Sequence, residues 1–355
     1  MSSVKIQGSA TGTAAFTIAV PDGTSTDRTI NLPDAAGSFV TKDANNNIAG
    51  IASINGGQLG GDRNIVVNGM FAVSQRGDFT SASSASNSTY YVDRWIAVVT
   101  TVTANKQHLL NTTYGNAFLL TATSTGTGRL GIVQRLETQP YMLNTTVTLS
   151  CWVKSNNANA RLYIYNDVDG MNTSTPHTGD GTWQKLTMSL ALTSGWTDFE
   201  VSSRIMSSTN TNVSITSGDY IQTAQVQLEV GSTPTVFQNE LYSTTLQKCQ
   251  RYFVRHTSGS NGLVGPALYE QSNVAVAACE FPTEMRAAPT LTASSGTNYY
   301  NLYPSNDAFN SLSIAIPNTK RSLVFNSSEV SGTVGYATTM RTNGSGVTVD
   351  FDAEL

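Results

Sequence analysis

The sequence predicts an all-β protein, and three observations lead to this fold class. Ser and Thr account for 39 and 48 of the 355 residues, while only 12% of the residues are charged. Short segments of alternating apolar and polar residues recur along the chain between turns rich in Ser, Asn and Gly, as expected of strands with one buried face. Only one short segment has helical periodicity, which argues against an α/β fold. The length corresponds to two or three domains.

Residues 1–62 are predicted to form an N-terminal β arm or stem. Short β patterns at residues 16–20 and 28–33 are separated there by turn residues. So few strands cannot bury a core of their own, and their edges stay unpaired unless other strands cover them. We therefore expect this arm to join the protein to a larger assembly or to further copies of itself, as a homo-oligomer. A glycine-rich segment at residues 56–61 marks the boundary.

Residues 63–238 are predicted to form an antiparallel β-sandwich. In several segments every second side chain is apolar and faces a core. These side chains are Val147, Leu149, Cys151 and Val153, then Leu186, Met188 and Leu190, and then Ala224, Val226, Leu228 and Val230. Trp152 and Trp183 are expected to cover sheet faces, and Trp196 is expected on a loop. Burial of these Trp residues is favoured over ligand contact, because Trp is highly buried on average.

Residues 239–355 are predicted to hold one short linking helix and a second, smaller β domain. Five side chains at a spacing near 3.6 residues place the helix at about 240–250. They are Leu241, Thr245, Leu246, Cys249 and Tyr252. Beyond the helix the alternation resumes at residues 252–255, 274–277, 312–316 and 346–351. These segments predict a C-terminal β-sandwich that is smaller than the first.

Charge and hydropathy exclude several partners. The net charge is −4 and no run of Lys and Arg could neutralise phosphates, so nucleic acid is not an expected partner. No apolar stretch reaches the roughly 18 residues of a membrane span, and the start of the chain lacks the apolar segment of a signal peptide. We therefore expect synthesis in a cytoplasm and no membrane insertion. The three widely spaced cysteines predict neither a disulfide framework nor a cysteine zinc site.

No motif in the sequence predicts catalysis or a cofactor. Residues 126–131 match G-x-G-x-x-G, but a strand pattern follows where dinucleotide binding requires a helix, so a hairpin turn is preferred. His108, His177 and His256 have no Cys or carboxylate at a zinc-site spacing, and no G-x-S-x-G elbow is present. We expect a protein that is not an enzyme. Many pairs of its 24 acids could still cleave a glycoside once folded, so polysaccharide cleavage remains an alternative.

Asp167 and Asp169 are the weak metal candidates. They lie two positions apart beside Gly170, as in part of a calcium loop. The distant Glu that would complete an EF-hand loop is absent. Tight turns also select Asp and Gly, and a strand pattern precedes the segment. A turn between strands is therefore preferred, and no metal is expected.

The candidate ligand-binding residues lie in a Tyr-rich segment of the predicted C-terminal domain. They are Tyr299, Tyr300, Tyr303, Asn306 and Asp307. An aromatic ring packs against the apolar face of a sugar, while amide and carboxylate groups bind its hydroxyls. The segment interrupts the alternation, which predicts a loop that can carry recognition. Ordinary strand packing is the competing interpretation, since Tyr is a favoured strand residue.

Several short segments are informative through their order and spacing. They are NIVVNGMF (64–71), QRG (75–77), VDRW (92–95), VTLSCWVKS (147–155), QVQLEVGS (225–232), CQRY (249–252), APT (288–290) and DAEL (352–355). Together they resemble tail-fibre and related virion proteins of bacteriophages, in particular a family common among marine phages. Residues 27–34 resemble a segment often found at the start of such fibre proteins.

The resemblance implies a jelly-roll sandwich like a carbohydrate-binding module, followed by a second β domain and often assembled as a trimer. It implies a location in the virion, where residues 1–62 would contact other virion proteins. Similar carbohydrate-binding jelly rolls hold calcium with an acidic residue after the Phe and another in the last strand. Here Ala72 follows Phe71, and the last strand holds Thr223-Ala-Gln225. That calcium site is therefore not expected.

Three functions fit these expectations. The preferred one is a structural virion protein, a tail fibre or fibre-like protein that takes part in host attachment by binding a surface glycan. The first alternative is an architectural head-fibre, collar or capsid-decorating protein. The second alternative is a tail spike that degrades polysaccharide.

Overall fold

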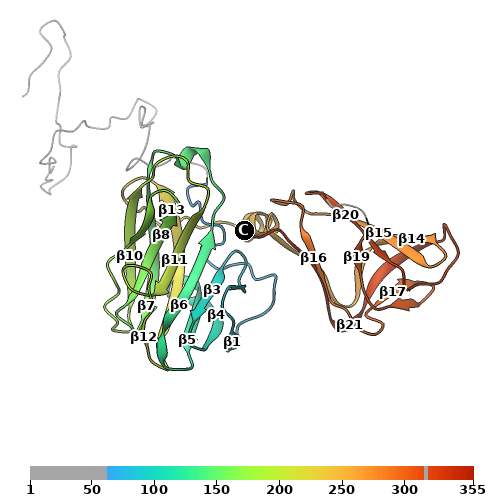
Figure 1. Ribbon diagram of the computed structural model, residues 1–355, viewed down its shortest axis with the longest axis horizontal. Helices are drawn as coiled ribbons and strands as arrows, with labels where there is room; N and C mark the ends of the chain where they lie inside the picture. Colours follow the sequence, from blue (N-terminus) through green and yellow to red (C-terminus); the bar gives the residue numbers. More distant parts are fainter. Residues whose placement is uncertain (1–61, 316–318) are drawn as a thin grey trace, which may run out of the picture. The chain divides into compact units, whose positions relative to one another are not determined.

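The computed structural model describes residues 62–315 and 319–355 (Figure 1). The predicted arm of residues 1–62, with the partners expected for it, lies outside the described residues apart from Asp62. The described part is all-β, as predicted, except for helix α1 (Tyr242–Gln250) and a 3-10 turn (Pro140–Met142). Within it, no helix has the length and apolar character needed to cross a membrane.

Two antiparallel sheets form the predicted sandwich (Figure 1). The first has the order β1 (Ser83–Ala85), β4 (Ala104–Thr112), β5 (Gly115–Ala122), β13 (Tyr220–Val230), β7 (Thr146–Ser155) and β10 (Trp183–Ala191). The second has the order β2 (Thr89–Tyr90), β3 (Ile96–Thr100), β6 (Gly126–Arg135), β11 (Phe199–Ile205), β8 (Ala160–Asn166) and β9 (Gly170–Thr173), and β12 (Val213–Ile215) pairs with β6. Strand β13 lies between β5 and β7, so pairings distant in sequence close the sandwich.

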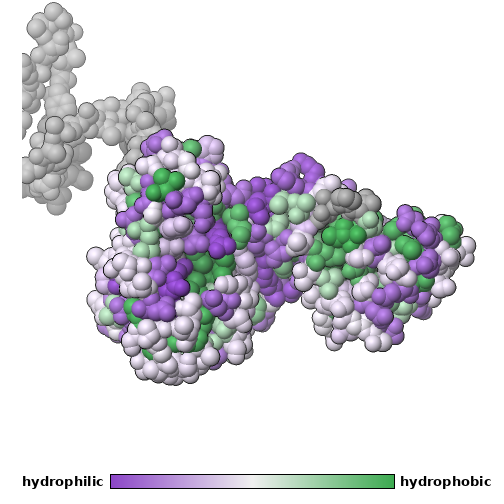
Figure 2. All heavy atoms as spheres, in the orientation of Figure 1, coloured by the Kyte–Doolittle hydropathy of each residue, from purple (hydrophilic) through white to green (hydrophobic). Residues whose placement is uncertain are grey.

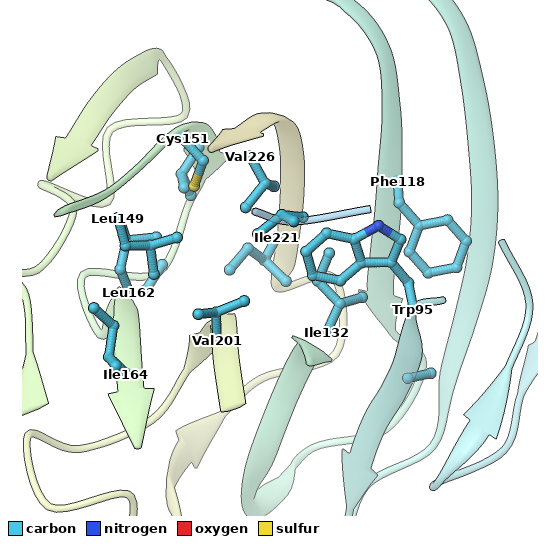
Figure 3. Close-up of a cluster of buried hydrophobic side chains, with 14 of the residues drawn as sticks. Trp95, Phe118, Ile132, Leu149, Cys151, Leu162, Ile164, Val201, Ile221 and Val226 are labelled. Atoms are coloured by element: carbon cyan, nitrogen blue, oxygen red, sulfur yellow. The ribbon is translucent and has the colours of Figure 1, made fainter. Parts of the chain in front are cut away.

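The core of the sandwich consists of the inward side chains that the alternation predicts. Leu149 and Cys151 of β7 are fully buried between the sheets, whereas Trp152 between Cys151 and Val153 points outward. Figure 3 shows part of this core, with Trp95, Phe118, Ile132, Leu149, Cys151, Leu162, Ile164, Val201, Ile221 and Val226 labelled. Each large apolar side chain removed from water contributes roughly 1.5–3 kcal/mol. This face of each strand therefore carries most of the stability of the sandwich.

The glycine motif at residues 126–131 lies inside β6 and not in a hairpin turn. Strand β6 begins at Gly126 and pairs with β3 and β11 in the second sheet. Close packing requires glycine at position 131, because an added Cβ would lie 2.3 Å from the backbone oxygen of Ser203 and 2.3 Å from Cβ of Arg204. The glycines thus serve strand packing.

Helix α1 lies within the predicted segment at 240–250. Its buried side chains are Thr245 and Cys249, and Tyr252 just after the helix is also buried, as the 3.6-residue spacing predicts. Leu241 does not share this face. It has an extended backbone at the N-cap position and its side chain is exposed.

After the helix the chain forms one curled antiparallel sheet and not the predicted second sandwich. Its order is β18 (Asp307–Phe309), β17 (Tyr300–Tyr303), β21 (Ala337–Asp352), β14 (Phe253–Gln271), β15 (Val274–Glu280), β20 (Ser322–Ser327) and β19 (Ser313–Ile314), and β16 (Thr290–Ala293) pairs with β21. Strands β14 and β21 are 19 and 16 residues long, and their pairing shifts register at four places. Such irregularities bend strands. A single sheet can therefore curl around its own apolar core.

A cluster of charged residues joins the sandwich to the C-terminal sheet. The guanidinium of Arg76 lies 3.6 Å from Asp93, 3.4 Å from Asp352 and 3.2 Å from Glu354. It also lies over the ring of Phe253, 3.7 Å from the ring centre. Burial lowers the pKa of Arg76, and the nearby Asp93 and Asp352 oppose this effect. The contact between the two parts is thus polar and charged as well as aromatic.

Candidate functional site

Tyr300 does not lie where a ligand-binding residue is needed. Its side chain is fully buried in the core of the C-terminal sheet. The ring stacks on Phe309 with 5.4 Å between ring centres, and the hydroxyl donates to the carbonyl of Ser294 at 2.7 Å. The predicted contact between Tyr300 and a ligand is therefore wrong. Strand packing, the competing interpretation, describes this residue.

The other residues of the Tyr-rich segment do not converge on one site. Tyr299 and Tyr303 are exposed by 36% and 49%, but the ring of Tyr303 already holds the guanidinium of Arg341 at 4.3 Å. Asn306 has a positive φ of 53° in the turn between β17 and β18. Asp307 accepts hydrogen bonds from the Tyr269 hydroxyl at 2.9 Å and the Ser331 amide at 2.7 Å.

The placement of Asn306 and Asp307 follows from local chemistry. Asn tolerates the left-handed backbone conformation that the turn requires. The carboxylate of Asp307 links two separate segments, so its oxygen atoms serve the fold. Of the candidate set, Tyr299, Tyr303 and Asn306 are exposed, Asp307 is partly exposed and Tyr300 is buried.

Asp167 and Asp169 lie in the turn between β8 and β9, and both carboxylates hold a neighbouring loop. Asp167 accepts hydrogen bonds from the Thr197 hydroxyl at 2.7 Å and from two backbone amides. Asp169 accepts from the Thr193 hydroxyl at 2.6 Å. The Thr197 hydroxyl and the amides lower the pKa of Asp167 to about 2. In the described residues, no three His, Cys, Asp or Glu side chains gather as metal ligands.

Three aromatic side chains meet on the outer face of the first sheet, and we call them the aromatic platform: Tyr114, Trp152 and Trp183. Tyr114 lies in the turn between β4 and β5 and stacks on Trp152, with 3.8 Å between ring centres and 12° between ring planes. Trp183, at the start of β10, meets the ring of Tyr114 edge-on at 5.4 Å. All three are partly exposed. The expectation that Trp152 and Trp183 cover a sheet face agrees with this position.

Polar side chains continue the platform across the sheet. The strand register aligns one row of outward residues across β10, β7, β13, β5 and β4, namely Trp183, Lys154, Gln222, Leu119 and Gln107. A second row places Trp152 between Lys185 and Ala224. The face therefore combines apolar ring surface with ammonium and amide groups that can bond hydroxyls.

The sequence alone did not reveal the platform, because its residues are distant in sequence. Tyr114 lies in a turn with no pattern that links it to β7, and only the pairing of β5 and β7 with β13 brings it to Trp152. Trp196, which was expected on a loop, does lie between strands but is buried. Its ring packs against Phe199 at 5.0 Å. Trp196 thus belongs to the core and not to a site.

The C-terminal sheet carries a different kind of hollow. A pocket of about 660 Å³ is lined by aliphatic residues such as Leu263, Pro266 and Leu323 and by polar residues such as Glu280 and Ser322, and Figure 2 shows hydrophobic residues on the visible face of this domain. The ring of His256 lies at its edge, with Nε2 2.7 Å from the carbonyl oxygen of Val264. The lining of this hollow thus contains both apolar and polar residues.

No family model and no curated protein matches the chain. Solved structures that align with part of the chain include the enzymatically active domain of bacteriophage CBA120 tailspike protein 4, at 14% identity and a TM-score of 0.30, covering 47% of this chain and 21% of that one. The CBM22-1 xylan-binding domain of Paenibacillus barcinonensis Xyn10C has 14% identity and a TM-score of 0.27, over 44% of this chain and 99% of that one.

The tandem CBM22-1–CBM22-2 domains of the same xylanase have 10% identity and a TM-score of 0.27, covering 78% of this chain and 97% of that one. The chain thus has a distant structural similarity to carbohydrate-binding jelly rolls and to one phage tailspike domain, of which it spans about a fifth.

Proposed function

We propose that the protein is a fibre-like structural protein of a bacteriophage virion that binds a host-surface glycan on its aromatic platform. The observation that carries the binding function is the stacked pair of Tyr114 and Trp152 with Trp183 at its edge. These rings offer a sugar an apolar surface of fixed orientation. The sequence resemblance at residues 64–77 and 92–95 supports the virion part of the proposal.

The groups around the platform suit binding on an open sheet face. Sugar hydroxyls need both donors and acceptors, and the partly exposed amide of Gln107 supplies both, whereas Gln222 in the same row is buried. In the register Lys154 pairs with Trp183 and Lys185 pairs with Trp152, and both ammonium groups add donors. An extended row across five strands fits several sugar units of a polymer better than one small molecule.

The proposal includes no catalytic step. Glu229, on the same sheet face, is buried and accepts hydrogen bonds from Gln227 and Thr235. Asp180, close in sequence to Trp183, accepts from the amide and hydroxyl of Thr182. Both carboxylates hold loops in place, whereas glycoside cleavage needs two carboxyl groups facing one bond.

The test is a binding assay of purified protein on polysaccharide from the host surface. The variant Trp152→Ala should weaken binding by about 2 kcal/mol, or roughly thirtyfold, if the ring is a binding hot spot. Tyr336→Ala, which removes an exposed aromatic ring from the C-terminal domain, is the matched control and should bind like the parent. Unchanged binding by a folded Trp152→Ala protein would place the glycan elsewhere.

Two further observations separate the alternatives. Incubation with the polysaccharide should leave its chain length unchanged, and a shortened polymer would show a degrading tail spike. Antibody labelling of virions should place the protein on a tail fibre. Labelling of the collar or capsid, with no glycan binding by the parent, would show an architectural protein.

A further inference from the structure

The outer face of the second sheet carries a separate pocket of about 360 Å³. This volume lies in the range of small-molecule sites. Its lining includes Tyr90, Val98, Arg129, Arg135, Arg204 and Asn210. Three of its thirteen lining residues are arginines and one is a glutamate, Glu200, on a protein whose net charge is −4. So much positive charge in one place requires an explanation.

Strand alternation places the arginines on this face. In β6, Leu130 and Ile132 face the core, so Arg129 points outward. In β11, Ile205 faces the core, so Arg204 points outward. In the strand register Arg204 lies opposite Gly131 of β6. Because Gly131 has no side chain, Cβ of Arg204 can lie where a Cβ at position 131 would otherwise be. The two guanidinium groups therefore come from neighbouring strands.

The two arginines share a neutral acceptor. The Oδ1 atom of Asn210 accepts a hydrogen bond from Arg129 at 3.1 Å and another from Arg204 at 3.1 Å. Arg204 also donates to the Ser202 hydroxyl at 2.7 Å and lies over the ring of Tyr163 at 4.8 Å. In a shared site like this, two like charges repel each other, and an amide oxygen offers only partial compensation.

Neither arginine has an anionic partner in the described part of the chain. Its ion pairs include neither Arg129 nor Arg204. Arg204 is only 4% exposed, and the Nε atom of Arg129 is buried without a hydrogen-bond partner. Buried charges are usually paired. These two groups therefore provide a preformed place for an anion.

The opposite end of the pocket is already neutralised. Arg135 pairs with Glu200 at 3.0 Å, and Glu200 also accepts from the Tyr163 hydroxyl at 2.7 Å. The carbonyl of Leu355 accepts from the Tyr90 hydroxyl at 3.0 Å. The end formed by Arg129 and Arg204 thus holds two guanidinium groups that take part in none of these ion pairs.

Arg204 keeps its charge at neutral pH. Burial lowers its pKa to about 10, while Tyr163 and Glu200 oppose this effect and Arg129 adds to it. A pKa near 10 still leaves the group cationic at pH 7. A bound anion would relieve the repulsion between the two guanidinium groups.

We propose that Arg129, Arg204 and Asn210 form a binding site for the carboxylate of an acidic sugar, such as a uronic acid unit of a polysaccharide. Guanidinium groups bind carboxylates through paired hydrogen bonds. Asn87, Ser88 and Thr100 also line the pocket and can bond the sugar hydroxyls. The sugar part rests on the proposed function, whereas the carboxylate part rests on the two arginines alone.

The test compares galacturonate, galactose and sulfate as probes, measured by calorimetric titration of the full-length protein. Galacturonate should bind the parent, and Arg129→Gln and Arg204→Gln should each weaken it by at least about tenfold, because a charge-assisted hydrogen bond is lost. Galactose should bind at least about tenfold more weakly than galacturonate, by the same reasoning. The matched control is Arg321→Gln, since Arg321 is an exposed arginine paired with Glu284.

The other outcomes are also decisive. Sulfate that binds the parent as tightly as galacturonate, and loses affinity in both variants, would overturn the sugar and leave a site for inorganic anions. Equal galacturonate affinity in all four proteins would overturn the site itself. Melting curves verify that each variant folds. If Arg204→Gln unfolds, the test rests on Arg129→Gln, which changes the less buried of the two arginines. Trp152→Ala should bind galacturonate normally, which separates this site from the aromatic platform.

Discussion

Arg94 of the sandwich and Glu354 after strand β21 form an ion pair in which both side chains are almost fully buried, with 1% and 5% of their side-chain surface exposed. The guanidinium of Arg94 lies over the ring of Tyr252 at 3.6 Å and donates to the carbonyl of Arg135 at 2.5 Å. Burial lowers the pKa of Arg94. A buried charge of this kind depends strongly on its partner.

We expect Glu354→Gln to lower the free energy of unfolding by about 3 kcal/mol, because it leaves the buried charge of Arg94 without a counter-charge. Urea denaturation at pH 7 measures the change. Glu284→Gln is the matched control, since the pair of Glu284 with Arg321 is exposed and such pairs contribute about 0–1 kcal/mol. Equal effects of the two substitutions would contradict the structural role of the buried pair.

The two tyrosines at the ends of β17 should differ in their effect on stability. Tyr300→Ala removes a fully buried ring and should lower the free energy of unfolding by about 3–5 kcal/mol. Tyr303→Ala removes a half-exposed ring that contacts Arg341 and should cost about 0.5 kcal/mol. Thermal unfolding of both variants tests this order. A larger loss for Tyr303→Ala would contradict the burial of Tyr300.

Gly131→Ala should destabilise the second sheet. The added methyl group would lie 2.3 Å from Cβ of Arg204 and from the backbone oxygen of Ser203, and overpacking of this kind costs about 1–3 kcal/mol. Gly346→Ala is the control, because nothing lies within 4 Å of a Cβ at that position. Urea midpoints of the two variants give the comparison. If both midpoints stayed unchanged, β6 and β11 would be able to move apart near residue 131 without a loss of stability, which would contradict the prediction.

Asp167 should make stability depend on pH between about 4 and 2. Its pKa falls from 3.8 to about 2 on folding, so the charged carboxylate stabilises the folded state above pH 4, and this contribution is lost as pH falls through 2. The variant Asp167→Asn has no carboxyl group to titrate at this position. The difference in urea midpoint between parent and variant should therefore be constant above pH 5 and change progressively as pH falls toward 2. A difference that stays the same across this range would refute the assignment.

Local patterns predicted the fold where a strand has one buried face. Leu149 and Cys151 illustrate this, because their alternation with Ser150 and Trp152 follows directly from strand geometry. The curl of the C-terminal sheet was not predictable in this way, since it depends on register shifts between β14 and β21. Such shifts arise from pairing and leave no local signal.

The candidate sites were harder to predict than the fold. Tyr299 and Tyr300 are adjacent, but Tyr299 just before β17 is exposed and Tyr300 at its start is buried in the core. The mixture of Tyr, Asn, Ser and Asp in this segment predicted a loop, and a loop prediction does not distinguish a buried Tyr300 from an exposed Tyr299. Arg129 and Arg204 are 75 positions apart and meet only through the pairing of β6 with β11. No single-sequence pattern links residues at that separation.

The buried pair of Arg94 and Glu354 also sets an order of events during synthesis. The two residues are 260 positions apart, so Arg94 leaves the ribosome long before its partner exists. We expect the nascent chain to keep Tyr252 and Phe253 open to proteases until β21 has emerged, because domains fold as their residues become available. Limited proteolysis of ribosome-bound chains stalled near residue 330 and of released full-length protein would show this as cleavage confined to the stalled chains.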